Sequence, residues 1–203
     1  MDIKRIVFVG VGGQGNLLSS RVLGEAALLA GIPVNVSEVH GMAQRGGVVE
    51  SAVVLGGALS SIVSNGEADV LIGFEPSETL RALEKCSKGT TVITNITPLM
   101  PFTVAVGKGV YPNIKEALTL IRQKVKRLIA LNADALAAEA GSAMAVNIVM
   151  LGALAQSNTV PITADQMKEA LRMNLNKKLW DINLKAFDLG FEAAKNEGIR
   201  FEV

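Results

Sequence analysis

The chain has 203 residues, of which 49% are hydrophobic and 19% are charged. This composition supplies enough apolar material for a sizeable core and excludes an intrinsically disordered chain. The 20 Lys and Arg residues nearly balance the 19 Asp and Glu residues, so there is no general positive field to attract nucleic acid.

The first quarter of the chain alternates between predicted strands and one helix. Residues 6–9 form a continuous apolar run that ends at a glycine, as expected for a strand buried on both faces of a parallel sheet. Apolar residues at helical spacing predict a helix over 16–30, which a glycine and a proline then stop. Valine-rich segments predict further strands at 34–39 and 48–55, with an aperiodic loop at 40–47 between them.

The middle of the chain continues this alternation. Residues 69–74 and 90–94 are typical strands, and the sequence Glu-Pro-Ser-Glu at 75–78 opens a helix between them, with proline and acidic residues in favoured positions. Weaker strands are expected near 102–106 and 127–131. The alternation indicates a doubly wound sheet with helices on both of its faces.

The C-terminal third is mainly helical. Residues 144–154 are almost entirely apolar, which predicts a helix buried between other elements, with Asn147 bonded to a neighbouring backbone group. The sequence Thr-Ala-Asp-Gln at 163–166 resembles a capping box at the start of another helix. Further helices are expected at 114–121, 134–140 and 179–194. We therefore predict one α/β domain over residues 1–203, with a Rossmann-like, mostly parallel sheet and additional C-terminal helices.

A glycine-rich sequence directly follows the first predicted strand. Residues 10–15, GVGGQG, match the G-x-G-x-x-G pattern between a strand and a helix, which is the setting of dinucleotide-binding loops. Glycines let a ligand approach the backbone, and a helix N-terminus directs free N–H groups toward a phosphate or carboxylate. A tight turn that binds nothing would need the same glycines. The candidate anion-binding residues of this loop are Gly10, Gly12, Gly13, Gln14 and Gly15.

The loop at 40–47 contains a second candidate. Arg45, followed by Gly46 and Gly47, offers a permanently charged, forked donor to a phosphate or carboxylate. The alternative, which the sequence favours slightly, is that Arg45 pairs with Glu38, with another local acid or with a partner subunit. Glu38 is also the acidic residue that would bind a ribose hydroxyl if the glycine loop held a dinucleotide.

The sequence lacks the residues of several catalytic sites. Cys86 is the only cysteine, so a disulfide, a thiolate zinc site or an iron–sulfur cluster cannot be built from this chain alone. His40 is the only histidine, and a structural role is expected for it. No lysine of a triphosphate-binding loop follows Gly15, and no G-x-S-x-G sequence is present. We therefore assign no catalytic and no metal-binding residues.

The N-terminal segment contains no targeting sequence that we can identify. Its apolar run at 6–9 is too short for a signal-peptide core or a membrane span. With a single cysteine in the chain, this predicts a cytoplasmic protein.

Taken together, the two loops resemble the gamma-type domain of 2-oxoacid:ferredoxin oxidoreductases. The sequence HGMAQRGG at 40–47 is the discriminating part, because pyruvate and 2-oxoglutarate members tend to carry Pro-Glu-x-Arg-Gly-Gly there. The form found here resembles the small subunits of the indolepyruvate type. The resemblance continues through 147–154 and 183–190, so it covers nearly the whole chain.

This resemblance implies a subunit that does not bind thiamine and that completes the cleft for oxidative decarboxylation of aryl 2-oxoacids to acyl-CoA, with ferredoxin as electron acceptor. It implies a large partner subunit that carries thiamine diphosphate, Mg and 4Fe-4S clusters, so the isolated chain should be inactive. It also implies that the glycine loop and Arg45 face the phosphates of coenzyme A. Two alternatives remain open from the sequence: a stand-alone NAD(P)- or FAD-binding oxidoreductase that uses Glu38, and a purely structural docking module.

Overall fold

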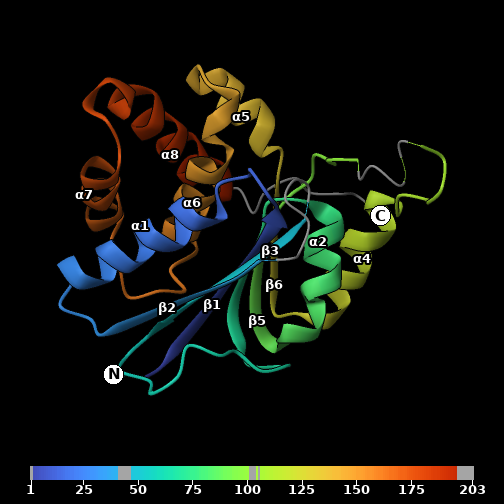
Figure 1. Ribbon diagram of the computed structural model, residues 1–203, viewed down its shortest axis with the longest axis horizontal. Helices are drawn as coiled ribbons and strands as arrows, with labels where there is room; N and C mark the ends of the chain where they lie inside the picture. Colours follow the sequence, from blue (N-terminus) through green and yellow to red (C-terminus); the bar gives the residue numbers. More distant parts are fainter. Residues whose placement is uncertain (1, 41–46, 101–103, 105, 196–203) are drawn as a thin grey trace.

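The computed structural model describes residues 2–40, 47–100, 104 and 106–195. Its centre is a six-stranded sheet with the strand order β2-β3-β1-β4-β5-β6 (Figure 1). β1 runs parallel to β4, β4 to β5 and β5 to β6, whereas β3 is antiparallel to both of its neighbours. All strands except β3 therefore point the same way, which confirms the predicted mostly parallel α/β sheet. The strands are β1 (Lys4–Val11), β2 (Val34–His40), β3 (Val48–Leu55), β4 (Ala68–Gly73), β5 (Cys86–Asn95) and β6 (Arg127–Leu131).

Helices cover both faces of the sheet (Figure 1). Because side chains alternate along a strand, Ile6 and Phe8 of β1 pack against the layer of α1, α5, α6, α7 and α8. Val7 and Val9 pack on the opposite face, in the cluster that α4 and the segment after α2 complete. The helices are α1 (Asn16–Leu29), α2 (Pro76–Arg81), α4 (Ile114–Lys124), α5 (Ala133–Ala140), α6 (Val146–Ser157), α7 (Ala164–Asn174) and α8 (Trp180–Lys195), with short 3₁₀ segments at Ala82–Lys85, Ala143–Ala145 and Lys177–Leu179.

Local capping interactions define the ends of several helices. Thr163 and Gln166 form the predicted capping box of α7, in which each side chain accepts a hydrogen bond from the other residue's backbone N–H. Asn113 caps α4 by accepting from two backbone N–H groups of its first turn. Gly141 ends α5 in the left-handed conformation, with a φ of 111°, which glycine adopts without strain.

Two predicted strands differ from the structure or cannot be compared with it. β5 begins at Cys86 rather than near Thr90, because Cys86 pairs with Ala68 before an irregularity shifts the register to the Val70–Thr91 pair. The strand expected at 102–106 falls mostly outside the described residues. Of its residues that are described, 104 is helical and 106 lies in a turn, so the prediction is wrong at these two positions. Of the helices in the described ranges, none combines the length and the apolar character that a membrane crossing requires.

The predicted central helix is α6, which crosses α8 at two glycines. A Cβ atom on Gly152 would lie 2.0 Å from the Phe187 carbonyl oxygen, and one on Gly190 would lie 1.9 Å from the Val149 carbonyl oxygen. Two backbones approach this closely only where side chains are absent. The glycine pair therefore sets the distance between α6 and α8.

Replacing Gly152 by alanine is expected to destabilise the fold by at least about 2 kcal/mol, because the methyl group meets backbone that cannot turn away. Urea unfolding monitored by circular dichroism measures the change. Gly89→Ala is the matched control, since its Cβ would have only the Ser87 hydroxyl at 3.7 Å. Equal stability of the two variants would contradict the close crossing.

Candidate functional site

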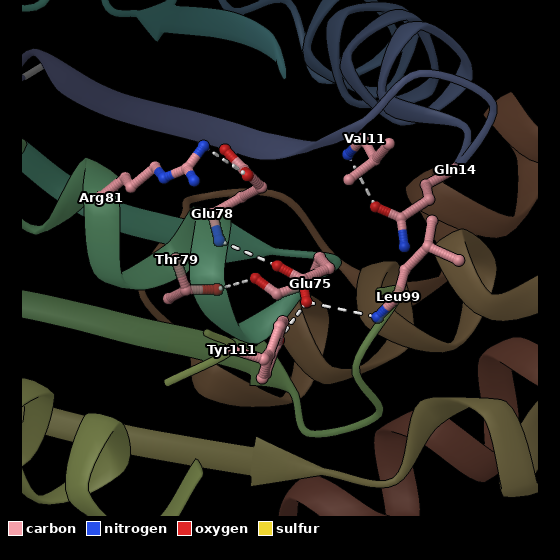
Figure 2. A network of polar contacts seen from close by, with 8 residues as sticks. All are labelled: Val11, Gln14, Glu75, Glu78, Thr79, Arg81, Leu99 and Tyr111. Carbon is pink, nitrogen blue, oxygen red and sulfur yellow. Dashed lines mark hydrogen bonds and ion pairs between the residues drawn. The ribbon is translucent and has the colours of Figure 1, made fainter. Parts of the chain in front are cut away.

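The carboxyl ends of β1 and β4 form the switch point of the sheet. The chain leaves β1 toward α1 on one face and leaves β4 toward α2 on the other, so the two connections diverge between neighbouring strands. Ligands of open α/β sheets bind at such a divergence. The glycine loop (residues 10–15) lies on one side of it and Glu75 on the other (Figure 2).

The glycine loop is built from backbone conformations and close contacts that need glycine. Gly13 and Gly15 have φ values of 100° and 85°, and Gly15 occupies the N-cap position of α1. A Cβ atom on Gly10 would lie 2.8 Å from the Gln14 amide oxygen and 3.1 Å from Phe74. A Cβ atom on Gly13 would meet nothing within 4 Å. Gly10 is thus needed for packing, whereas Gly13 faces open space.

Gln14 closes the switch point with its own side chain. Its Oε1 accepts from the Val11 backbone N–H at 2.8 Å, and its Nε2 donates to the Phe74 carbonyl at 3.2 Å. The first of these bonds is drawn in Figure 2. Gln14 therefore ties the turn after β1 to the end of β4, and it occupies a backbone donor that a ligand would otherwise meet.

The two loops that the sequence singled out meet in the structure. The backbone N–H of Gly12 donates to the Gly47 carbonyl at 2.9 Å, which joins the glycine loop to the start of β3. Arg45 and Gly46 lie outside the described residues, so their position at the site stays a prediction.

Two asparagines fix the start of α1. Asn147 of α6 is 3% exposed, and its Nδ2 donates to the Gly15 carbonyl at 3.4 Å, which confirms its predicted bond to a neighbouring backbone group. A Cβ atom on Gly15 would lie only 2.7 Å from the Asn147 side chain. Asn16, which sequence reasoning did not single out, donates to the Val49 carbonyl at 2.6 Å. The glycine loop is therefore held from α6 and from β3.

Glu75, on the other side of the switch point, is a buried carboxyl group with three donors. It is 1% exposed and is the N-cap residue of α2, where its Oε2 accepts from the Glu78 N–H at 3.0 Å. Its Oε1 accepts from the Leu99 N–H at 3.3 Å and from the Tyr111 hydroxyl (Figure 2). Burial raises the pKa of Tyr111, and the bond to Glu75 and the charge of Glu75 raise it further. The phenol therefore stays protonated as a donor.

Glu78, one turn along α2, is a second buried carboxyl group. It is 5% exposed, and its Oε1 lies 3.0 Å from the Arg81 guanidinium. No donor among the described residues reaches its Oε2. Burial raises the pKa of Glu78; the Arg81 charge opposes this shift, and the Glu75 charge adds to it. Sequence reasoning read these carboxyl groups correctly as the start of a helix, but the acidic pattern itself gave no sign of their burial.

Asn95 links the remaining parallel strands to this edge. Its Nδ2 donates to the Phe74 carbonyl at 3.1 Å and lies 2.7 Å from Asp134 Oδ2, while its Oδ1 accepts from the Ala133 N–H. The Phe74 carbonyl therefore accepts from both Asn95 and Gln14. The ends of β4 and β5 and the start of α5 are fastened by one buried amide.

The topology argues against the dinucleotide alternative. In the Rossmann fold the strand that carries the ribose-binding carboxylate lies directly beside β1. Here the reversed strand β3 separates them, since Glu38 pairs with Ser51 and Ser51 pairs with Phe8. Two inter-strand spacings, about 10 Å, thus separate Glu38 from the strand that leads to the glycine loop.

Cys86 and the possible metal ligands can also be placed in the described part of the chain. Cys86 is buried at the amino end of β5, where desolvation raises its pKa to about 11, so the thiol stays protonated at neutral pH. Within the described ranges, no three side chains of His, Cys, Asp or Glu are grouped so that they could hold a metal ion.

Comparison with known proteins places this arrangement in a family. The family model described as "Pyruvate ferredoxin/flavodoxin oxidoreductase" matches residues 5–193. The chain belongs to this family. It is 43% identical to the "Indolepyruvate oxidoreductase subunit IorB" of Pyrococcus horikoshii, over 96% of this chain and 98% of that protein.

Two solved structures have the same fold as this member of the pyruvate ferredoxin/flavodoxin oxidoreductase family. The gamma subunit of a keto/oxoacid ferredoxin oxidoreductase from Geobacter sulfurreducens matches with a TM-score of 0.70 and 24% identity, over 95% of this chain and 99% of that one. The 2-oxoglutarate:ferredoxin oxidoreductase of Magnetococcus marinus matches with a TM-score of 0.73 and 23% identity, over 100% of this chain but 33% of that one. The same fold thus occurs both as a separate chain and inside a longer one.

Tyr111→Phe removes one donor from the buried Glu75 carboxyl group and should lower the free energy of unfolding by about 1–3 kcal/mol. Chemical denaturation at neutral pH measures the loss. Thr119→Ala, which removes an exposed hydroxyl that bonds the Lys115 carbonyl of its own helix, should change stability by less than about 0.5 kcal/mol. A Tyr111→Phe variant as stable as this control would mean that Glu75 does not depend on the phenol.

Proposed function

We propose that this chain is the non-thiamine-binding subunit of an indolepyruvate-type 2-oxoacid:ferredoxin oxidoreductase. It completes the cleft in which aryl 2-oxoacids are oxidatively decarboxylated to acyl-CoA, with ferredoxin as electron acceptor. The observation that carries this proposal is the identity of 43%, 42%, 40% and 40% to four proteins named "Indolepyruvate oxidoreductase subunit IorB", each over at least 93% of this chain.

The chemistry of the described residues supports an accessory role. The polar groups at the switch point bond one another, since Gln14 bridges two loops and Glu75 caps a helix. A protonated tyrosine and a protonated, buried cysteine supply neither a base nor a nucleophile. We therefore propose that residues 1–203 act as one gamma-type domain that shapes the cleft, and that bond breaking takes place on the partner.

The cofactors of the complete enzyme follow from the same assignment. We propose that a large partner subunit carries thiamine diphosphate, Mg and 4Fe-4S clusters, and that ferredoxin docks through the complex. A 4Fe-4S cluster takes four cysteine ligands, and this sequence has one cysteine. A complex with reduced clusters suits a reducing compartment, so we propose the cytoplasm as its location.

The proposed ligand contact of this chain is a phosphate of coenzyme A. The N–H groups of Gly13 and Gly15 have no acceptor among the described residues, and the side of Gly13 where a Cβ would lie is open. These groups sit at the positive end of α1, which favours an anion. Arg45, Gly46 and Gly47 would complete the site from the neighbouring loop. Gly10, Gly12 and Gln14 would support it through the internal bonds and contacts described above.

Ferredoxin reduction with indolepyruvate and coenzyme A should need both subunits. The purified large subunit alone and this chain alone are expected to be inactive, and mixing them should restore turnover in proportion to the amount of complex formed. The measurement is the absorbance of a ferredoxin under anaerobic conditions. Full activity of the large subunit without this chain would refute the accessory role.

Arg45→Ala distinguishes a ligand contact from a docking module. A contact with a coenzyme A phosphate predicts an intact complex whose KM for coenzyme A rises about tenfold or more, because a charge-assisted hydrogen bond is lost. A purely structural role predicts loss of the complex in size-exclusion chromatography, with an unchanged KM for whatever complex remains. Lys115→Ala, an exposed cation on α4, is the control and should change neither quantity.

A further inference from the structure

A separate surface of the molecule carries an inference that the proposed function does not use. β2 is the end strand of the sheet, and among the described strands it has a neighbour only on the side of β3. Such an edge presents unpaired backbone N–H and C=O groups, which soluble proteins usually cover or protect with charge. Two residues of β2, Val36 and Val39, are 43% and 65% exposed.

A groove runs between this edge strand and α1. It has a volume of about 550 Å³, and its strand side is formed by Val34, Val36 and Glu38. Its helix side includes apolar residues, of which Leu17 and Leu28 are 45% and 60% exposed. An exposed apolar groove beside an unpaired strand is typical of a surface that another protein covers. We call it the α1–β2 face.

The two charges that α1 contributes to this face can pair with the same two charges of a second copy. Arg21 and Glu25 both line the groove, one helical turn apart on α1. Neither forms an ion pair with another described residue. In a two-fold symmetric contact, residue i of one copy meets residue j of the other, and j meets i in return. The exposed side of α1 carries one cation and one anion between apolar residues at both ends, so two copies of it can pair in this reciprocal way.

We propose that a second copy of this chain covers the α1–β2 face. Two α1 helices that cross antiparallel on their groove sides, with the two-fold axis midway along the helix between Arg21 and Glu25, bring Arg21 of each copy opposite Glu25 of the other. The same register brings Leu18, which also lines the groove, opposite Leu28. The edge strands β2 of the two copies then lie side by side, and Val36, which lines the groove, leaves the solvent. The polar network around Glu75 takes no part in this contact.

A charge-exchange experiment on the full chain tests this dimer. Sedimentation equilibrium of the wild type should show a monomer–dimer equilibrium. Arg21→Glu and Glu25→Arg should each raise the dimer dissociation constant about tenfold or more, because each places like charges in contact twice across the two-fold axis. The double variant Arg21→Glu/Glu25→Arg should return the constant to within about threefold of the wild type, since it re-forms both pairs in reverse.

The outcomes separate the dimer from other uses of the face. Lys115→Glu on α4, on the opposite face of the sheet, is the control and should leave association unchanged. Circular dichroism shows whether each variant is folded, and the double variant keeps the composition of the wild type. A wild-type chain that is monomeric at all concentrations, and that becomes larger only with the large subunit, would overturn the proposal. A dimer indifferent to both single variants, or not restored by the double variant, would also overturn it.

Discussion

The carbonyl oxygen of Phe74 holds the carboxyl edge of the sheet together. It lies just after β4 and accepts from Gln14 in the turn after β1 and from Asn95 at the end of β5. The backbone N–H of the same residue donates to the Val9 carbonyl of β1. Three parallel strands are therefore joined through one residue, and the glycine loop and Glu75 both lie next to it.

The glycine loop shows how one sequence pattern can serve two geometries. In a dinucleotide-binding fold, the loop after β1 turns its N–H groups to a pyrophosphate while the next strand supplies a carboxylate to the ribose. In this chain the antiparallel strand β3 lies between β1 and β2, so β2 is at the edge of the sheet. The N–H groups of Val11 and Gly12 donate to acceptors within the protein. What remains is a shorter donor surface around Gly13 and Gly15, which is where the proposed phosphate contact would lie.

Much of the fold could be predicted because the signals were local. The apolar run at 6–9, the capping box at 163–166 and the nearly uniform apolar helix after 144 each depend on residues close together in sequence. The direction of β3 was not predictable in this way, because strand pairing depends on partners far along the chain. For the same reason, sequence reasoning found the glycines but missed Glu75 and Tyr111. In the sequence, the pattern of a helix-capping carboxyl group is the same whether that group is exposed or buried in the fold.

The α6–α8 crossing also determines the position of Asn147, which lies near the start of α6. Gly152 and Asn147 are five residues apart on α6, about 7.5 Å along a rigid helix. The depth at which the two glycines let α6 settle on α8 therefore also fixes how far the Asn147 amide extends toward Gly15. One end of α6 contacts the glycine loop through Asn147, and its middle packs on α8 at Gly152. A substitution at the α6–α8 crossing would therefore shift Asn147 relative to Gly15, so this packing contact and the geometry of the glycine loop are coupled.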